Sequence, residues 1–222
     1  MILAAGRGER MRPLTDHTPK PLLPVAGRPL IVWHVERLAK AGIDDIVINH
    51  AHLGDQIEAL LDDGSAWGVS IRYSEEPPGA LETAGGIANA LPLLGPEPFL
   101  VINGDIWSDW DLRCAHHPLA TGDMAHLVLV PNPPYHATGD FALTEHRVSA
   151  DGAAKFTFAG IGIYRPELFA ALPRGQSAKL APLLIEAMAV GRVSGELHAG
   201  GWEDVGTPDR LHALDAKLRA HL

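Results

Sequence analysis

The chain has 222 residues, 46% of them hydrophobic, so it can bury a substantial core without a disulfide framework, which its single cysteine, Cys114, excludes. A formal net charge of −9 argues against a protein that grips nucleic acid by its phosphates. No apolar run approaches the roughly 20 residues that span a bilayer, and no secretory signal precedes the first predicted strand, so we expect a cytoplasmic protein without membrane or nucleic-acid partners.

The first 131 residues alternate between segments typical of buried strands and segments of helical period. Short continuous apolar runs predict strands at 1–5, 45–50, 69–74, 99–104 and 126–131. Amphipathic periodicity predicts helices at 30–42, 53–64 and 82–94. Gly42 and Gly64 end the first two, because glycine favours the position after a helix. The alternation predicts an α/β fold with a Rossmann-like, mixed but mostly parallel sheet and helices on both faces.

The alternation stops after residue 131. Strands are predicted at 141–146 and 154–164. With no helix between them, we expect them to pair as small antiparallel additions to the sheet. Helices are predicted at 179–191 and 207–222. The second begins with Thr207 as N-cap and Pro208 as first helical residue. Because proline and glycine are spread through the loops and no linker appears, we predict a single domain over residues 1–222.

The first predicted strand leads directly into the sequence GRGERMR. Gly6 and Gly8 can adopt positive φ angles and expose backbone N–H groups to an anion. The spacing is not that of a Walker A loop, and Met11 stands where a dinucleotide-binding loop would need its third glycine. The pattern therefore predicts a different kind of phosphate-binding loop, with an ordinary turn as the alternative.

Positive charge is concentrated near this loop. Residues 7–40 hold seven Lys or Arg and three Asp or Glu, a balance of +4 in an acidic chain. Arg10, Arg12 and Lys20 are close enough in sequence to act on one anion, and charge-assisted bonds to phosphate are strong. Lys20 lies between two prolines in HTPKPL, which fix its backbone. This predicts a site for a small anionic ligand; solvated surface side chains are the alternative.

Two acidic segments are candidates for metal binding. Asp105 follows the strand predicted at 99–104, and ligands bind beyond the carboxyl ends of strands in an open parallel sheet. Glu203 and Asp204 stand beside Trp202 in GWEDVGTP, before the last predicted helix. Mg²⁺ takes one or two protein carboxylates and completes its shell with water and substrate phosphate. Two distant aspartates suffice if the fold joins them; a turn or N-cap role is the alternative for Asp105.

Taken together, these segments resemble the sugar-1-phosphate nucleotidylyltransferases. The sequence LAAGRGERMRPLT followed by PKPL is similar to that family's N-terminal motif, and LETAGGI, INGD and WEDVGTP continue the match in order over nearly the whole chain. The resemblance implies transfer of a nucleotidyl group from a nucleoside triphosphate to a sugar 1-phosphate, with Mg²⁺ and release of pyrophosphate. It also implies a nucleotide-binding half over about residues 1–110 and a sugar-binding half over about 111–222.

The resemblance further implies roles for individual residues. Nucleotide binding is expected from Ala4, Ala5, Gly6, Gly8, Glu9, Arg10, Lys20, Thr83 and Gly85. The sugar is expected to contact Asn103, Gly139, Asp140, Gly160 and Trp202, and the metal to be held by Asp105 and Asp204. The expected catalytic residues are Arg10, which would stabilise the leaving pyrophosphate, Lys20, which would bridge the two reacting phosphates, and Asp105. We expect in-line attack at the α-phosphorus.

Within the family, INHAHLGDQIE, GVSIRYS, INGDIW, GDFAL and KLAPLL are most similar to the bacterial branch that joins UTP to N-acetylmuramate 1-phosphate in cell-wall recycling. This implies those two substrates, in a monomer or small homo-oligomer. Mannose 1-phosphate with GTP, glucose 1-phosphate with dTTP, and a catalytically silent nucleotide-binding subunit are the alternatives. Glu76 replaces a glutamine that reads the base in many relatives, and a Glu-Lys-Pro segment of some relatives is missing near Lys155.

Overall fold

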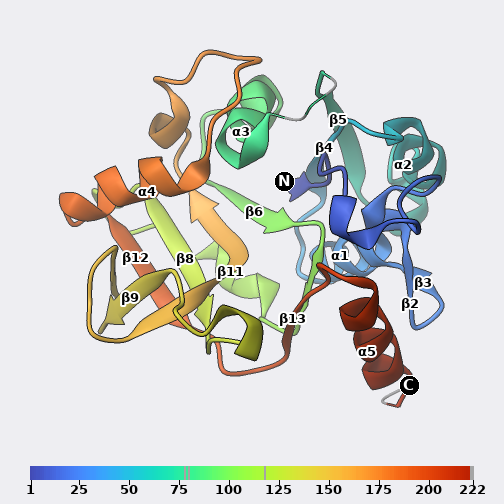
Figure 1. The fold of residues 1–222 in the computed structure, drawn as a ribbon. Coiled ribbons are helices and arrows are strands. Elements are labelled where there is room, and N and C mark those ends of the chain that lie inside the picture. Colours follow the sequence, from blue (N-terminus) through green and yellow to red (C-terminus); the bar gives the residue numbers. More distant parts are fainter. Residues whose placement is uncertain (78, 80, 118, 221–222) are drawn as a thin grey trace.

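The fold is organised around a nine-stranded sheet, seen in the computed structural model (Figure 1), which describes residues 1–77, 79, 81–117 and 119–220. In sheet order, its strands are β5 (Ser70–Glu75), β4 (Asp45–His50), β1 (Ile2–Leu3), β6 (Phe99–Asn103), β11 (Lys155–Tyr164), β8 (Ala125–Val130), β12 (Val193–Leu197), β10 (Arg147–Ser149) and β9 (Phe141–Thr144). Two short pairs accompany it: β13 (Trp202–Asp204) with β7 (Ile106–Ser108), and β2 (Pro24–Val25) with β3 (Arg28–Pro29).

Helices cover both faces of the sheet, as predicted. They are α1 (Leu30–Lys40), α2 (Gly54–Leu61), α3 (Glu82–Leu94), α4 (Leu180–Ala189) and α5 (Pro208–Arg219). Alternate side chains of one strand point to opposite faces, so Ile46 and Ile48 of β4 join the buried cluster that contains α1 and α2. Val47 joins the cluster that contains α3 and α4. α5 lies apart from the large sheet, against β2 and β13 (Figure 1).

The sheet is mixed, and the prediction that it is mostly parallel is wrong. β5, β4, β1 and β6 run parallel and form the Rossmann-like part. β11 is antiparallel to both β6 and β8, and it also pairs with β9. The strands β11, β8, β12, β10 and β9 therefore curve into a barrel-like ring. The reason is connectivity: strands that follow one another without a crossover helix return antiparallel, and β11 occupies the middle of the sheet rather than its margin.

Several elements match the sequence closely. β4 and α3 begin and end where they are predicted, and α5 begins at Pro208 after the N-cap Thr207. β1 is shorter than predicted, because the backbone N–H of Ala4 donates to Oδ1 of Asn49 at 2.9 Å instead of to a neighbouring strand. Residues 221–222 of the last predicted helix lie outside the described residues. The strands β2, β3, β7, β10, β12 and β13 were not predicted.

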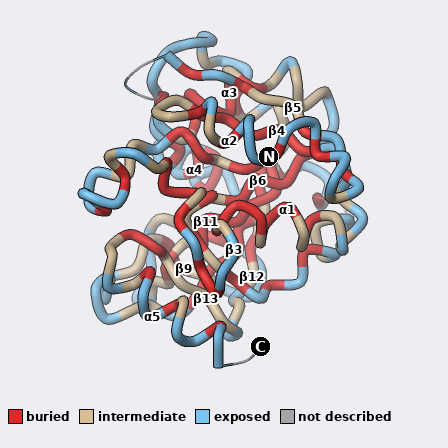
Figure 2. Tube along the Cα trace, turned by 90° about the vertical axis from the view of Figure 1, so that its right-hand side faces the viewer, coloured by how far each residue is buried: buried red, intermediate tan, exposed pale blue. Residues whose placement is uncertain are grey.

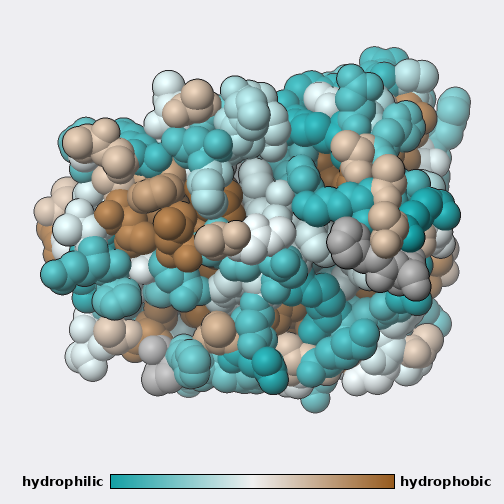
Figure 3. All heavy atoms as spheres, turned by 90° about the horizontal axis from the view of Figure 1, so that it is seen from below, coloured by the Kyte–Doolittle hydropathy of each residue, from teal (hydrophilic) through white to brown (hydrophobic). Residues whose placement is uncertain are grey.

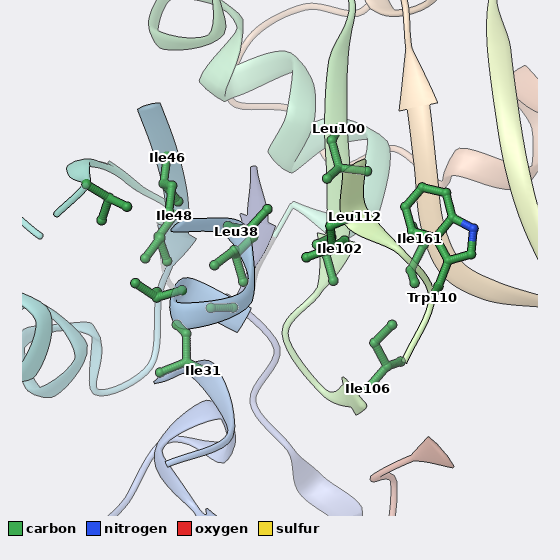
Figure 4. Close-up of a cluster of buried hydrophobic side chains, with 14 of the residues drawn as sticks. Ile31, Leu38, Ile46, Ile48, Leu100, Ile102, Ile106, Trp110, Leu112 and Ile161 are labelled. Atoms are coloured by element: carbon green, nitrogen blue, oxygen red, sulfur yellow. The ribbon is translucent and has the colours of Figure 1, made fainter. Parts of the chain in front are cut away.

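Buried residues concentrate along the central strands and the inward sides of the helices (Figure 2). Figure 4 shows the cluster in which Ile31 and Leu38 of α1 lie near Ile46 and Ile48 of β4. Seen from below, most of the surface is hydrophilic, with a hydrophobic patch on the left (Figure 3). No helix in the described part of the chain has both the length and the apolar character needed to cross a bilayer.

A third buried cluster connects the two ends of the chain. Met11 and Leu30, near the N-terminus, pack with Val205 and Leu214, near the C-terminus. Asp215 of α5 also accepts a hydrogen bond from the backbone N–H of residue 26 at 2.7 Å. β13 and the start of α5 are thereby held beside the glycine-rich loop.

Candidate active site

Two adjoining cavities open beyond the carboxyl ends of β1 and β6. The first has a volume of about 460 Å³ and the second about 410 Å³. Arg10, Asn103 and Asp105 line both, so the cavities meet at these three residues. The first extends toward the glycine-rich loop and α3, and the second toward β11, β13 and the start of α5. Their position is the one expected for ligands of an open α/β sheet.

The glycine-rich loop forms one wall of the first cavity. The predicted nucleotide-binding residues that line it are Ala4, Ala5, Gly6, Gly8, Glu9, Arg10, Lys20 and Thr83. Gly8 has a φ of 69°, and its carbonyl accepts a hydrogen bond from Thr15 Oγ1 at 2.9 Å. A Cβ at Gly8 would lie 3.0 Å from the Thr15 methyl group. The sequence thus forms a defined turn whose backbone faces the cavity.

Arg10 is the loop arginine that lines the cavities. Nε of Arg12 donates to Asp16 Oδ1 at 2.7 Å, and Nη1 of Arg7 donates to the carbonyl of Thr15 at 2.7 Å. Neither of these arginines lines a cavity. Arg10 lines both cavities, and no protein hydrogen bond or ion pair of its side chain is found among the described residues. The alternative of a solvated turn arginine describes Arg12, whereas Arg10, although exposed as well, borders both cavities.

Lys20 lies buried in the wall of the first cavity, beside Asp105. It is 7% exposed, and its Nζ lies 2.6 Å from Asp105 Oδ2. It begins a single 3₁₀ turn, with Pro19 before it and Pro21 after it, so its backbone is fixed as the sequence predicts. A buried ammonium group is tolerated when it is paired with a carboxylate. The Asp105 side chain is itself 37% exposed and reaches the cavity.

Asp105 directly precedes β7, and Asp204 ends β13, the strand that pairs with β7, so the two lie near each other despite their separation in sequence. β13 pairs antiparallel with β7, and the backbone N–H of Val205 donates to the Asp105 carbonyl at 2.9 Å. Both aspartates line the second cavity. Oδ2 of Asp204 accepts a hydrogen bond from Arg210 Nη1 at 2.7 Å. The fold therefore joins the two candidate metal ligands.

The donors of this site fit an Mg²⁺ ion that binds together with a phosphorylated substrate. Among the described residues, no group of three or more His, Cys, Asp and Glu side chains is arranged to hold a metal by itself. Asp105 and Asp204 contribute two carboxylates, each already paired with a cationic side chain, so a metal ion would need further oxygen ligands from the substrate. Mg²⁺ commonly takes one or two carboxylates and completes its shell with water and phosphate oxygens. The two aspartates suit that role.

The second cavity contains three of the residues predicted for the sugar. Asn103, Gly160 and Trp202 line it. Gly160 has a φ of 73°, and a Cβ there would lie 2.6 Å from Asn103 Nδ2, so this glycine makes room for the asparagine side chain. Nε1 of Trp202 donates to the carbonyl of Ala159 at 2.9 Å, which fixes the indole ring against β11.

Three other predicted residues shape the walls without lining the cavities. Gly85, Gly139 and Asp140 are absent from the lining of both. Oδ2 of Asp140 accepts a hydrogen bond from the backbone N–H of Phe158 at 2.8 Å, directly behind the second cavity. A Cβ at Gly85 would collide with the carbonyl oxygen of Gln176, so glycine allows that segment to pack on α3. Asp140 thus supports the second cavity through Phe158, and Gly85 and Gly139 have a packing role in the structure.

Glu76 connects two walls of the first cavity. It is 4% exposed; its Oε1 accepts from Asn49 Nδ2 at 2.6 Å, and its Oε2 accepts from the backbone N–H of Leu81 at 2.8 Å. Asn49 in turn accepts from the backbone N–H of Ala4. Glu76 thereby ties the loop after β1 to the start of α3. Lys155 lines neither cavity.

Several cavity residues were not singled out in the sequence. In the first cavity they include Asn49, Glu82, Ser177 and Gly206, and in the second Tyr135, His136, Thr157 and Arg210. Glu82 and Gly206 stand in the quoted motifs LETAGGI and WEDVGTP, whereas Ser177, Tyr135 and His136 stand in segments without a recognisable motif. Arg210 is different, because it follows the N-cap Thr207 by three positions and so lies on the first turn of α5. That spacing after WEDVGTP is a signal that could have placed Arg210 near Asp204.

Comparisons with known proteins agree with this geometry. The family model described as nucleotidyl transferase matches residues 1–221. The chain is 58% identical, over 97% of its length and 96% of the relative, to N-acetylmuramate alpha-1-phosphate uridylyltransferase of Neisseria meningitidis serogroup B. It is 38% identical, over 98% of its length and 96% of the relative, to the protein of the same name from Caulobacter vibrioides.

A solved structure supports the same fold. The Bacillus anthracis protein assigned as a glucose-1-phosphate thymidylyltransferase matches with a TM-score of 0.86 over 98% of this chain and 94% of that one, at 24% identity. The family model spans nearly all of the chain, and the motifs that carried the resemblance line the two cavities. The chain belongs to the nucleotidyl transferase family.

Proposed function

We propose that this chain is a uridylyltransferase that makes UDP-N-acetylmuramate and pyrophosphate from UTP and N-acetylmuramate 1-phosphate. The observation that carries the proposal is the 58% identity, over nearly the full length of both chains, to the N-acetylmuramate alpha-1-phosphate uridylyltransferase of Neisseria meningitidis. The geometry is consistent with it, since two cavities that share Arg10 and Asp105 can hold two phosphorylated substrates side by side.

In this proposal, UTP occupies the first cavity and the sugar phosphate the second. Backbone groups around Gly6 and Gly8 contact the triphosphate, because glycine permits a close approach of the main chain. Trp202 and Gly160 lie along the sugar. The nucleotide-binding half then covers about residues 1–110 and the sugar-binding half about 111–222, with Ser177 and Gly206 of the later half also reaching the first cavity.

The chemistry is an in-line substitution at phosphorus. A phosphate oxygen of the sugar attacks the α-phosphorus of UTP, and the bond from that phosphorus to the oxygen bridging to the β-phosphate breaks, so pyrophosphate leaves. The attacking oxygen is already ionised, so no general base is required. The main obstacle is repulsion between negative phosphates, and catalysis of such transfers depends on positioning and charge stabilisation.

Two cations of the chain are placed to reduce this repulsion. Lys20 lines the first cavity beside Asp105, which borders both cavities, and would bind both the α-phosphate and the sugar phosphate. Arg10 lines both cavities and would stabilise the charge that develops on pyrophosphate. Asp105 and Asp204 would hold Mg²⁺, which supplies Lewis-acid neutralisation of phosphate oxygens when it is bound. Each of these aspartates is paired with a side-chain cation, Asp105 with Lys20 and Asp204 with Arg210.

The test is a screen of pyrophosphate release that crosses UTP, GTP and dTTP with four sugar phosphates. These are the 1-phosphates of N-acetylmuramate, N-acetylglucosamine, mannose and glucose. The expected result is the highest kcat/KM for UTP with N-acetylmuramate 1-phosphate. Equal values for the two N-acetylated sugars would remove the muramate assignment, and a preference for GTP with mannose 1-phosphate would replace it.

A further inference from the structure

Arg210 is a cation of the sugar cavity that the proposed chemistry does not use. It lines the second cavity and not the first, whereas Arg10 lines both. Its side chain is 17% exposed and donates through Nη1 to Asp204 at 2.7 Å. Its guanidinium carbon also lies over the ring of Tyr135, 4.2 Å from the centroid, in a cation–π contact. Arg210 is therefore a partly buried cation held in a fixed orientation.

Gly206 makes this arrangement possible. A Cβ at that position would collide with Nη2 of Arg210 and would lie 3.0 Å from Nη2 of Arg10. Both guanidinium groups thus border the small space beside Gly206. Two positive groups so close together raise the local potential and favour a negatively charged ligand.

The proposed sugar substrate carries two negative groups, and they must lie apart. Its phosphate has to reach the α-phosphorus of UTP, so it belongs where Arg10, Asn103 and Asp105 join the cavities. Its second negative group is the lactyl carboxylate on the sugar ring, which N-acetylglucosamine 1-phosphate lacks. That group must lie within the second cavity, which Arg210 lines beside Asp204. His136 also lines this cavity, but its Nε2 lies 3.0 Å from Asp140 Oδ1.

We infer that Arg210 binds the lactyl carboxylate of N-acetylmuramate 1-phosphate and so distinguishes this sugar from N-acetylglucosamine 1-phosphate. The inference rests on the proposed function. A guanidinium group matches a carboxylate because it donates two parallel N–H bonds to the two oxygens. The contacts with Tyr135 and Asp204 hold the side chain in place before the ligand arrives, so binding immobilises it at little further entropic cost.

The first test compares the two sugar phosphates with UTP in the full-length enzyme. For Arg210→Gln, we expect the ratio of kcat/KM for N-acetylmuramate 1-phosphate to that for N-acetylglucosamine 1-phosphate to fall about 10- to 100-fold, the effect of losing a charged hydrogen bond. Arg210→Lys keeps the charge but loses the planar guanidinium group, so its ratio should lie between those of the wild type and Arg210→Gln. Arg219→Gln is the matched control: Arg219 lies on the same helix, pairs with Asp215 and lines neither cavity, so its ratio should equal that of the wild type.

A second test changes the substrate and leaves the protein intact. In N-acetylmuramate 1-phosphate whose lactyl carboxylate is converted to a carboxamide, the partner charge is missing. Wild-type enzyme should use this analogue with a kcat/KM lower by the same factor. Arg210→Gln should use the acid and the amide about equally, because it lacks the group that tells them apart. The comparison of the acid and the amide with the wild-type enzyme tests the inference even if Arg210→Gln folds poorly.

The outcomes separate the inference from the function on which it rests. Equal losses with both sugars in Arg210→Gln would overturn the inference and assign Arg210 to the phosphate or to the support of Asp204. Wild-type enzyme that does not distinguish the acid from the amide would overturn it as well. Wild-type enzyme that rejects N-acetylmuramate 1-phosphate while using another sugar phosphate would instead refute the proposed function.

Discussion

At the scale of single residues, the site contains charges that are paired before any ligand binds. Nζ of Lys20 lies 2.6 Å from Oδ2 of Asp105, and Nη1 of Arg210 lies 2.7 Å from Oδ2 of Asp204. Such pairing offsets the cost of holding charged groups in a partly buried place. A phosphate that binds Lys20 must therefore compete with Asp105, whereas Arg10 has no comparable partner among the described residues. Substitution of Lys20 tests directly whether this side chain binds phosphate.

Substitution Lys20→Met should lower kcat about 10²- to 10³-fold, the effect of removing one preorganised group that stabilises charge in a transition state. The methionine keeps a similar length without the ammonium group. Steady-state pyrophosphate release with UTP and N-acetylmuramate 1-phosphate measures the change. Arg12→Gln serves as the control, because Arg12 is an exposed residue of the same segment that pairs with Asp16 and lines neither cavity. A loss for Lys20→Met no larger than that of the control would rule out a catalytic role for Lys20.

At the scale of elements, α1 shows how one helix face supports the site. Leu30, His34 and Leu38 point inward, as their spacing predicts. His34 is 2% exposed, and its Nε2 has no hydrogen-bond partner among the described residues. Burial, followed by the positive charge of Arg37, lowers the pKa of His34 from 6.5 to about 4. The helix therefore packs around a neutral imidazole.

The stability of the protein should consequently fall in mild acid. Between pH 6.5 and about 4, the unfolded chain binds a proton at His34 that the folded chain excludes, so lowering the pH favours unfolding. This group alone contributes a slope of up to about 1.4 kcal/mol per pH unit. In His34→Gln that contribution should vanish, which urea unfolding of both proteins across this range measures. Parallel curves of unfolding free energy against pH for the two proteins would contradict the assignment.

Elements with local signals could be predicted, whereas elements fixed by distant partners could not. β4 contains the apolar run Ile46, Val47 and Ile48 and is buried on both faces, and its predicted bounds were confirmed. β7 and β13 have three residues each and become strands by pairing with one another, with Trp202 opposite Ser108. The same register brings Asp204 to Asp105. Spacing along the chain contains no information on that contact, and only the family resemblance pointed to it.

In the candidate site too, residues with a local sequence signal could be predicted, whereas residues placed by distant contacts could not. The glycine-rich loop and Lys20 lie in one continuous segment with a charge pattern of its own, so they could be found from residues alone. Tyr135 and Arg210 are distant in sequence, and only the folded structure brings them together in the second cavity. Gly85 was predicted to contact nucleotide, but its place is set by the packing of the segment at Gln176. Motifs indicate which segments lie near the cavities, and packing decides which of their residues line them.

At the scale of the whole molecule, the two ends of the chain meet to form the site. The last strand and helix pack on the first turn and hairpin, with Val205 and Leu211 against Met11 and Val25. Figure 1 shows α5 beside the N-terminal elements, while β8, β11 and β12 lie on the other side of β6. The two ends of the chain are thus held together by a buried apolar cluster, and the metal-binding candidates Asp105 and Asp204 lie at the cavity surface. Folding should therefore be independent of the metal.

Removal of divalent metal should abolish activity and leave the fold intact. With excess EDTA, kcat should fall at least about 10³-fold, because the charge stabilisation that the metal supplies amounts to several kcal/mol. The Tm should change by less than about 3 °C, equivalent to less than about 1 kcal/mol for a chain of this size. The reason is that Lys20 and Arg210 continue to neutralise Asp105 and Asp204 when no metal is present.

Calorimetry of one sample before and after chelation measures this change in Tm, and return of activity on addition of Mg²⁺ serves as the control. Addition of UTP with Mg²⁺ should then raise the Tm, since a ligand that binds only the folded state stabilises it in proportion to the logarithm of its concentration over Kd. A Tm that drops by more than about 10 °C on chelation would mean that the metal holds the two ends of the chain together. In that case the buried cluster of Met11, Leu30, Val205 and Leu214 would not be sufficient for their association.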